Sequence, residues 1–323
     1  MNYRRLGRSG LKVSELSLGS WVTYGGQVDE DTSLRCIRQA FDLGVNYFDC
    51  ADMYAEGKAE QVLGKAIRGV PRNELVISTK LFWPAMKGPN GRGLSRKHII
   101  ESIEGSLRRL GLDHVDLYFC HRFDPEVPLE ETVRTMSQLV DQGKVLYWGT
   151  SEWHADQIAS AFDAAHELHC QPPSMEQPQY NLFRRRRVEY ELARLAERYG
   201  IGLTTFSPLA FGVLTGKYGE GIPAGSRATV PGYEWMREES LSPGRIEKAR
   251  RFTQLAMELG LPPAQLAIAW CLRSPLVSSV ITGASRIEQV RENLGAAEVQ
   301  SQLTPEVLAR LDEIFAPPQR EEA

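Results

Sequence analysis

Four polar side chains have the types and positions that a proton-transfer site requires. Asp49, Lys80 and His121 each stand at the end of a short run of apolar and β-branched residues. Tyr54 follows five residues after Asp49, in the segment NYFDCADMY. If these runs are parallel strands of a barrel, their carboxyl ends meet at one mouth, and we expect the four side chains to converge there.

Such a set suits the reduction of a carbonyl group, in which a hydride adds to carbon and the oxygen receives a proton. The usual pKa of a tyrosine hydroxyl is about 10, well above neutral pH. A nearby ammonium group favours the phenolate, so we predict that Lys80 lowers the pKa of Tyr54, the proton donor. Asp49 would hold Lys80 in place and keep it charged. A neutral His121 would hydrogen-bond the substrate oxygen and orient it, and a nicotinamide would have to supply the hydride.

Each of these residues also has a structural interpretation. Tyr54 alone would be a packing residue with a solvated hydroxyl, and His121 alone a structural histidine. Lys80 and Asp49 alone could form an ordinary ion pair. Lys and Asp are rarely buried unless they are paired, so the combination favours a reaction site. A strand-end Lys80 also leaves open the Schiff-base chemistry of a barrel lyase, to which the pairing of Asp49 with Tyr54 gives little support.

Short apolar runs alternate with longer helical stretches along the chain. Several runs are nearly continuous in apolar or β-branched residues, which is typical of parallel strands buried on both faces. The helical stretches repeat apolar residues with helical spacing, as at Leu129, Val133 and Met136. Thr304-Pro305 predicts the start of a final helix that extends to about Phe315. The predicted strands are Leu16–Ser20, Val45–Asp49, Leu75–Lys80, Val115–His121, Val145–Ser151, Ser174–Gln177, Leu203–Ser207 and Ser279–Gly283.

Eight alternations of strand and helix in about 300 residues match an α/β fold of the (β/α)8 TIM barrel type. A doubly wound sheet would carry a glycine-rich phosphate fingerprint, and no Gly-x-Gly-x-x-Gly occurs in this chain. We therefore predict a single barrel domain over residues 1–323, with an N-terminal β-hairpin at 3–13 and an extra C-terminal helix. Long loops at 82–94 and 209–245 are expected at the mouth, and residues 319–323 are expected to fray.

Composition and charge disfavour several other classes of protein. A net charge of −3, with Lys and Arg spread along the chain, disfavours a nucleic-acid binder. The five cysteines are scattered and the histidines lack metal-ligand spacing, so we expect neither a disulfide framework nor a metal site. The N-terminus lacks the apolar core of a signal peptide, and no apolar run approaches the ~20 residues of a membrane-spanning helix. We predict a cytoplasmic protein that does not insert into membranes.

The ordered set of Asp49, Tyr54, Lys80 and His121 resembles the Asp–Tyr–Lys–His tetrad of the aldo-keto reductases. Within that family the chain is most similar to the β subunits of voltage-gated potassium channels and their bacterial and plant relatives. The resemblance extends over residues 3–315. The segments that carry it are GSWVTYGG (19–26), NYFDCADMYAEGKAEQVLG (46–64), GLSRKHIIES (93–102), YWGTSEW (147–153), SPLAFGVLTGKY (207–218) and LAIAWCLR (266–273).

The resemblance implies an NADPH site at the carboxyl ends of the strands. Ser151 and Gln177 would hold the nicotinamide carboxamide, and Phe206 would stack on its ring. Arg227 would bind the 2′-phosphate, and Ser285 lies where a helix N-terminus attracts phosphate. The implied cofactor-binding residues are Gly19, Ser20, Trp21, Asp49, Ser151, Gln177, Phe206, Ser207, Pro208, Leu209, Ala210, Gly212, Lys217, Arg227, Gly283, Ser285, Gln289, Glu292 and Asn293.

Two positions depart from the channel subunits, which carry Asn in place of His121 and Arg in place of Glu152. His121 restores the more usual reductase tetrad and favours turnover. We therefore predict NADPH-dependent reduction of aldehydes or ketones to alcohols, with Tyr54 as general acid. The alternative is an NADPH-binding, redox-sensing channel partner with slow turnover. The relatives assemble as tetramers, so we expect a homo-oligomer, and we expect no N-terminal extension of the kind that some channel subunits carry.

Two further groups of residues have weaker implications. Trp83, Trp153, Tyr24 and Phe82 are expected to line an apolar, aromatic mouth that accepts the small carbonyl substrate. The run Arg184–Arg187 is interpreted as a solvated helix face, with a subunit contact or an anion site as alternatives.

Overall fold

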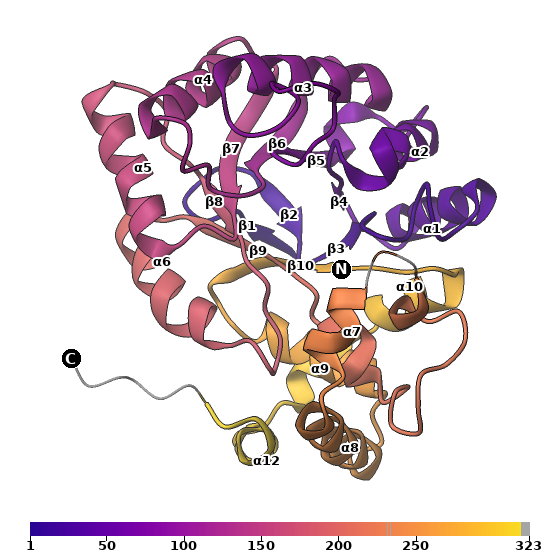
Figure 1. The fold of residues 1–323 in the computed structure, drawn as a ribbon. Helices are drawn as coiled ribbons and strands as arrows, with labels where there is room; N and C mark the ends of the chain where they lie inside the picture. The colour runs from indigo at the N-terminus through magenta and orange to yellow at the C-terminus, as the bar shows by residue number, and fades with distance from the viewer. Residues whose placement is uncertain (231, 233, 318–323) are drawn as a thin grey trace.

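Eight parallel strands close into a barrel in the computed structural model, which describes residues 1–230, 232 and 234–317 (Figure 1). Each strand pairs with two neighbours in the order β10-β3-β4-β5-β6-β7-β8-β9. The strands are β3 (Leu16–Gly19), β4 (Tyr47–Asp49), β5 (Val76–Leu81), β6 (Val115–Cys120), β7 (Val145–Ser151), β8 (Met175–Gln177), β9 (Gly202–Phe206) and β10 (Val277–Thr282).

All eight predicted barrel strands are present; β7 has the predicted bounds, the others differ at their ends, and the largest shifts are at the starts of β4 and β10. β4 begins at Tyr47 rather than at Val45, because the backbone N–H of Val45 still donates to Ala40 at the end of the preceding helix. β10 begins at Val277 rather than at Ser279, because Val277 already pairs with Leu203 ahead of a shift in register. The barrel prediction is therefore confirmed, and local pairing accounts for the two largest differences in strand bounds.

Helices surround the barrel, and the longer ones bury apolar residues along one side. The final predicted helix is confirmed, and the Thr304 side chain accepts a hydrogen bond from the backbone N–H of Val307 at its N-terminus. A π-helical turn, Arg187–Leu192, precedes α6. The helices are α1 (Glu30–Asp42), α2 (Lys58–Ala66), α3 (Arg96–Leu110), α4 (Leu129–Asp141), α5 (Ala155–Glu167), α6 (Ala193–Tyr199), α7 (Glu234–Ser240), α8 (Pro243–Glu258), α9 (Pro263–Leu272), α10 (Ile287–Leu294), α11 (Ala296–Val299) and α12 (Pro305–Phe315).

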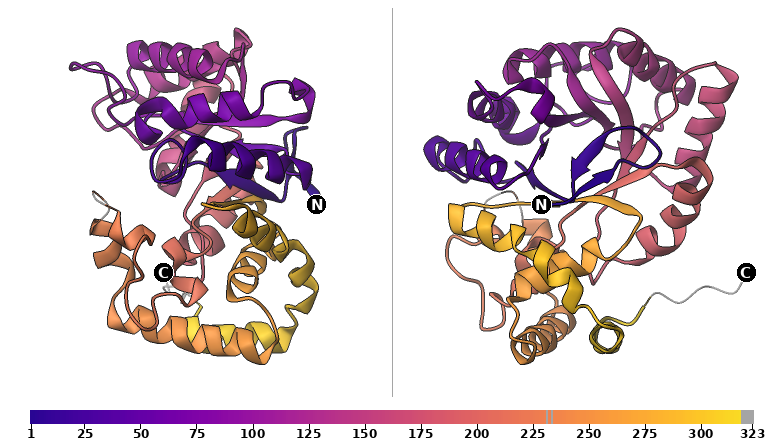
Figure 2. Two further views of the ribbon diagram at one scale, coloured as in Figure 1. Left: turned by 90° about the vertical axis from the view of Figure 1, so that its right-hand side faces the viewer. Right: turned by 180° about the vertical axis from the view of Figure 1, so that it is seen from behind.

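The predicted N-terminal hairpin is present and closes one end of the barrel. Its antiparallel strands are β1 (Tyr3–Arg5) and β2 (Lys12–Ser14). Leu6 and Val13 are fully buried and pack with the inward-facing side chains of the barrel strands. In the right-hand view of Figure 2 the hairpin lies across the end of the barrel that faces away from the viewer in Figure 1. The site must therefore open at the opposite end.

Two long segments leave that opposite end, as expected. The segment predicted as a loop at 209–245 is partly helical: it contains short 3-10 helices at Ala210–Thr215 and Arg227–Thr229, then α7 and the start of α8. The expectation of fraying at 319–323 falls outside the described residues. In the described part of the chain, no single helix is both long enough and apolar enough to cross a membrane. The pair α8 and α9 reaches the required length and apolarity only when the two helices are taken together, and they are bent by 96°.

The closed floor gives a prediction for stability. Replacing the fully buried Leu6 by Ala should lower the free energy of unfolding by about 2–5 kcal/mol, because it leaves a cavity between the hairpin and the barrel. Leu146→Ala on β7 is the control, since Leu146 is 40% exposed, and it should change that free energy by less than about 0.5 kcal/mol. Urea denaturation followed by circular dichroism measures both. Equal losses in the two variants would contradict a packed floor.

Candidate active site

A cavity of about 1170 Å³ opens at the carboxyl ends of the barrel strands. Its wall includes Asp49 from the end of β4, Tyr54 from the segment after it, and His121 directly after β6. Lys80, near the end of β5, is fully buried behind this wall. The structure thus brings the four predicted catalytic side chains together at one end of the barrel.

A buried ion pair lies at the centre of the group. The Nζ of Lys80 donates to Oδ2 of Asp49 at 2.6 Å and to the carbonyl oxygen of Cys50 at 2.7 Å. The other carboxylate oxygen of Asp49 accepts from the Ser78 hydroxyl at 2.7 Å and from the Gln177 amide at 3.0 Å. Both charges are therefore hydrogen-bonded as well as paired, which is what burial of an ion pair requires.

Lys80 makes a third contact, to the hydroxyl of Tyr54. Its Nζ donates to that oxygen at 3.3 Å and lies 4.9 Å from the centre of the ring. The tyrosine opens a 3-10 turn, Tyr54–Gly57, in which Ala55 and Glu56 both have positive φ. Left-handed backbone at a non-glycine residue costs about 1–2 kcal/mol, and such strain is concentrated at functional sites.

The prediction that Lys80 lowers the pKa of Tyr54 is wrong in direction. Burial of the hydroxyl, followed by the negative charge of Asp49, raises the pKa of Tyr54 well above its usual value. The ammonium of Lys80 is paired with that carboxylate at 2.6 Å, and its contact with the hydroxyl does not outweigh burial. At neutral pH Tyr54 therefore carries its proton and is ready to donate it, and Lys80 can stabilise the phenolate that donation leaves.

His121 is kept neutral by its surroundings. Burial, followed by the positive charges of Lys80 and Arg122, lowers the pKa of His121 well below its usual value. Its ring meets that of Tyr54 edge to face, with centroids 5.9 Å apart. A neutral imidazole has one N–H donor, and in this position it can offer that donor to a substrate oxygen beside the phenol. The predicted role of His121 is compatible with this geometry.

Most of the residues implied in cofactor binding lie on the cavity wall. Ser20 and Ala210 do not: both are buried behind it, and the Ser20 hydroxyl donates to the Asp49 carbonyl oxygen at 3.0 Å. The implied residues that line the cavity are Gly19, Trp21, Asp49, Ser151, Gln177, Phe206, Ser207, Pro208, Leu209, Gly212, Lys217, Arg227, Gly283, Ser285, Gln289, Glu292 and Asn293.

Three cations gather at one side of the cavity. Lys217 packs against Gly212, where an added Cβ would come within 2.7 Å of its side chain. Burial, followed by the charges of Arg227 and Arg286, lowers the pKa of Lys217. Such mutual repulsion is costly unless an anion lies between the cations, so this side of the cavity is suited to phosphate.

Several wall residues were not anticipated from the sequence. Arg122 and Arg286 directly follow His121 and Ser285. Their position next to predicted site residues could have indicated that they also line the cavity. Phe211 and Trp235 come from the segment predicted as a loop, where nothing in the sequence indicates which side chains turn inward. Phe211 contacts both Trp21 and Trp235 edge to face at 5.9 Å, which ties that segment to the wall.

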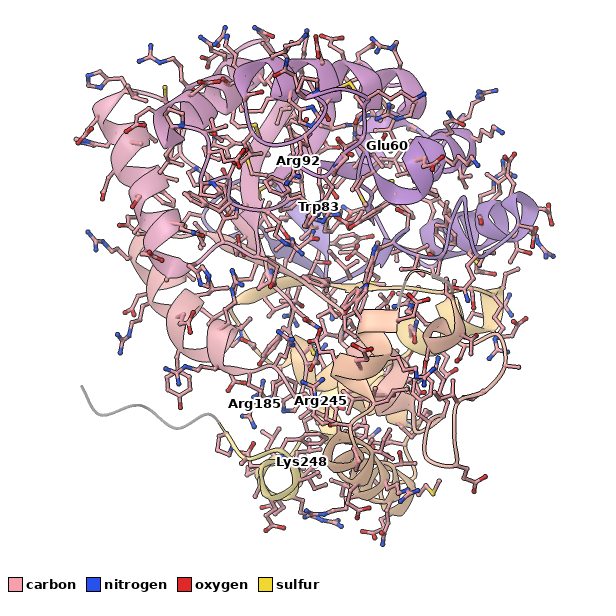
Figure 3. All side chains as sticks on the ribbon, viewed as in Figure 1. Glu60, Trp83, Arg92, Arg185, Arg245 and Lys248 are labelled. Carbon is pink, nitrogen blue, oxygen red and sulfur yellow. The ribbon has the colours of Figure 1, made fainter. Side chains whose placement is uncertain are left out.

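The predicted aromatic mouth needs correction. Trp83 lines the cavity, and Figure 3 shows it over the middle of the barrel. Tyr24, Phe82 and Trp153 are buried and lie behind the cavity wall. Trp153 is covered by Phe123, whose ring meets it edge to face at 4.9 Å. These large aromatic rings pack in the core instead of facing the substrate.

The interpretation of Arg184–Arg187 as a solvated helix face is also wrong for two of its members. Arg185, labelled in Figure 3, is 7% exposed, pairs with Asp312 at 2.6 Å and lies over the ring of Trp270. Arg187 bridges Glu152 and Glu176, each at 3.2 Å. Asp312 and Glu152 are distant from the run in sequence, so the run alone does not indicate these pairs.

Within residues 1–230, 232 and 234–317, no group of three or more His, Cys, Asp or Glu side chains is arranged to hold a metal ion. The polar atoms at the mouth are instead those of a phenol, an imidazole, an amide and a carboxylate.

Together, these features define a TIM barrel with its candidate site at the carboxyl ends of the strands. Residues 15–316 match the family described as the aldo/keto reductase family, and the chain belongs to that family. It is 50% identical to a rice (Oryza sativa subsp. japonica) protein and to an Arabidopsis thaliana protein, both named "Probable voltage-gated potassium channel subunit beta". Each alignment covers 100% of this chain and 99% of the relative.

The lowered pKa of His121 gives a prediction that needs no substrate. In histidine-labelled protein, the imidazole signal of His121 should not shift between pH 8 and about 5.5, whereas it titrates near pH 6.5 in urea-unfolded chain. The variant His121→Asn identifies the signal by its loss. Below about pH 6.5 the unfolded chain protonates His121 and the folded protein does not. The contribution of His121 to the free energy of unfolding is therefore complete above about pH 6.5 and is lost as the pH falls below that value. An NMR titration of folded His121 near pH 6.5 would contradict the assignment.

Proposed function

We propose that this protein is an NADPH-dependent reductase that converts aldehydes or ketones to alcohols, with Tyr54 as the general acid. One observation carries the proposal: the protonated hydroxyl of Tyr54 lies 3.3 Å from the ammonium of Lys80, on the wall of a cavity that neutral His121 also lines. This arrangement supplies a donor, a group that stabilises the donor's anion, and a second hydrogen-bond donor for the same oxygen.

The cavity suits a dinucleotide with phosphate groups. Lys217, Arg227 and Arg286 bring three positive charges together on the cavity wall, and Gly212 leaves room for Lys217 to lie close to the backbone. Lys217 and the two arginines would hold phosphates, and Phe206 would lie against the nicotinamide. When bound, NADPH would supply the hydride for the carbonyl carbon.

The chain's own residues account for the movement of the proton. The carbonyl oxygen accepts hydrogen bonds from His121 and Tyr54, which polarise it. As negative charge develops on that oxygen, the phenol of Tyr54 gives up its proton. Lys80 then stabilises the phenolate through the 3.3 Å contact, while Asp49 keeps Lys80 charged and fixed. Burial keeps water away, so these contacts are stronger than they would be in solvent.

Removal of the phenol oxygen tests this assignment. Tyr54→Phe should reduce kcat for 4-nitrobenzaldehyde by about 10²–10⁴-fold, because general acid catalysis is lost. NADPH binding, followed by quenching of tryptophan fluorescence, should be unchanged, since the ring and its packing remain. NADPH oxidation at 340 nm measures turnover. Turnover equal to that of the original protein would remove Tyr54 from the mechanism.

The cation cluster makes a separate prediction about the cofactor. Arg227→Gln should weaken NADPH binding by about 10–100-fold and NADH binding much less, because a charge-assisted bond to the 2′-phosphate is lost. Arg251→Gln on α8, where the side chain is exposed, makes the same change of charge away from the cavity and should alter neither affinity. Isothermal titration calorimetry measures all four constants. A loss of the same size for NADH and NADPH would contradict this role of Arg227.

A second function is favoured by the names of the relatives, which describe probable potassium channel β subunits. Under that alternative the chain binds NADPH, turns over slowly and reports redox state to a channel. Measurable turnover that depends on Tyr54 would favour the reductase, whereas co-purification with a channel and negligible turnover would favour the subunit. A homotetramer, a cytoplasmic location and a single domain over residues 1–323 are part of the proposal in either case.

A further inference from the structure

Arg122 lies at the reacting end of the cavity. It directly follows His121, and both residues line the wall together with Tyr54. Its guanidinium donates to the carbonyl oxygen of His121 and lies over the ring of Trp83, 5.8 Å from the ring centre. The cation is therefore held in position beside the groups that would receive a carbonyl oxygen.

The guanidinium of Arg122 has no acidic partner in the part of the chain that the structure describes. Burial lowers the pKa of Arg122, and the charge of Glu152 opposes this shift more than any other charge. The Glu152 carboxylate, however, already pairs with Arg187 at 3.2 Å and accepts from the backbone N–H of Gln179 at 2.6 Å. Arg184, another arginine on the cavity wall, differs in being paired with Glu239. Among the described residues, the Arg122 guanidinium makes one hydrogen bond, to the carbonyl oxygen of His121, so its other N–H groups remain for a ligand in the cavity that it lines.

This cation does not belong to the phosphate side of the site. Arg122 follows β6, whereas Lys217, Arg227 and Arg286 follow β9 and β10. In the closed barrel, β6 is four strands away from β10 in either direction and three strands away from β9. Arg122 and the cation cluster therefore lie on opposite sides of the mouth, and a dinucleotide held by the cluster would leave Arg122 to the other reactant.

A half-buried cation with open donors is costly, and a bound anion offsets that cost. Arginine suits planar or tetrahedral oxyanions, because its fork of N–H groups matches two oxygens at once. We propose that Arg122 is a specificity-determining anion anchor, and that the site prefers carbonyl compounds carrying a carboxylate or a phosphate. This inference rests on the proposed reductase function. It names the substrate class for that same site.

A matched pair of aldehydes tests the proposal. 4-Carboxybenzaldehyde and 4-nitrobenzaldehyde have nearly the same shape, and only the first carries a charge. The ratio of their kcat/KM values should fall by about 10–100-fold in Arg122→Gln, because a charge-assisted, bidentate contact is lost. Arg122→Lys should keep part of the ratio, since it retains the charge without the fork. Arg134→Gln, which removes an exposed charge on α4, should leave the ratio unchanged.

The same variants separate the two possible anions and the two possible failures. Glyceraldehyde 3-phosphate and glyceraldehyde form the matched pair for phosphate, and the pair whose kcat/KM ratio falls more in Arg122→Gln identifies the preferred anionic group.

If 4-nitrobenzaldehyde is reduced but neither ratio falls in Arg122→Gln, the anion anchor is overturned and the reductase proposal stands. If no aldehyde is reduced by the original protein, the reductase proposal fails. Calorimetry with 4-(hydroxymethyl)benzoate then decides the anchor: binding lost in Arg122→Gln supports it, and equal binding overturns it.

Discussion

The buried ion pair between Asp49 and Lys80 is the interaction on which the mouth of the barrel depends. Two charges in a dry interior are tolerated only when every polar atom finds a partner, and loss of one partner of such a pair costs about 3–5 kcal/mol. Here Ser78 on β5 and Gln177 on β8 complete the carboxylate, and the carbonyl of Cys50 completes the ammonium. One ion pair therefore fixes three strand ends relative to one another, and the phenol of Tyr54 with them.

The same lack of water sets the protonation of the neighbouring groups. Burial raises the pKa of Tyr54 and lowers the pKa of His121, so both groups are neutral at physiological pH and both can donate a hydrogen bond. Neutral donors are less costly to bury than ions, and they favour an oxygen that becomes negative. The tetrad thus combines one tightly paired pair of charges with two groups that the surroundings keep uncharged.

Much of this arrangement could be predicted from the sequence, because strand ends are visible in it. Runs of β-branched residues identify the strands. Because the carboxyl ends of parallel strands meet at one end of a barrel, the sequence alone predicts that Asp49, Lys80 and His121 lie close together. The direction of the pKa shift of Tyr54 could not be predicted, because it depends on burial. The burial of Arg185 was missed for a related reason: besides Glu189, four residues on, it pairs with Asp312, which is 127 residues away in sequence. Side-chain direction at a non-periodic position such as Trp153 is likewise set by tertiary packing.

The order of the site residues along the chain has a further consequence. Tyr54, Trp83, His121 and Arg122 come before Ser151 in the chain, whereas most of the cavity residues implied in cofactor binding lie from Ser151 onward. Under the proposed function, the N-terminal part that selects the compound to be reduced can diversify while the C-terminal part that holds the common reductant is preserved. Such a division lets one barrel acquire different substrates through changes in a few adjoining loops.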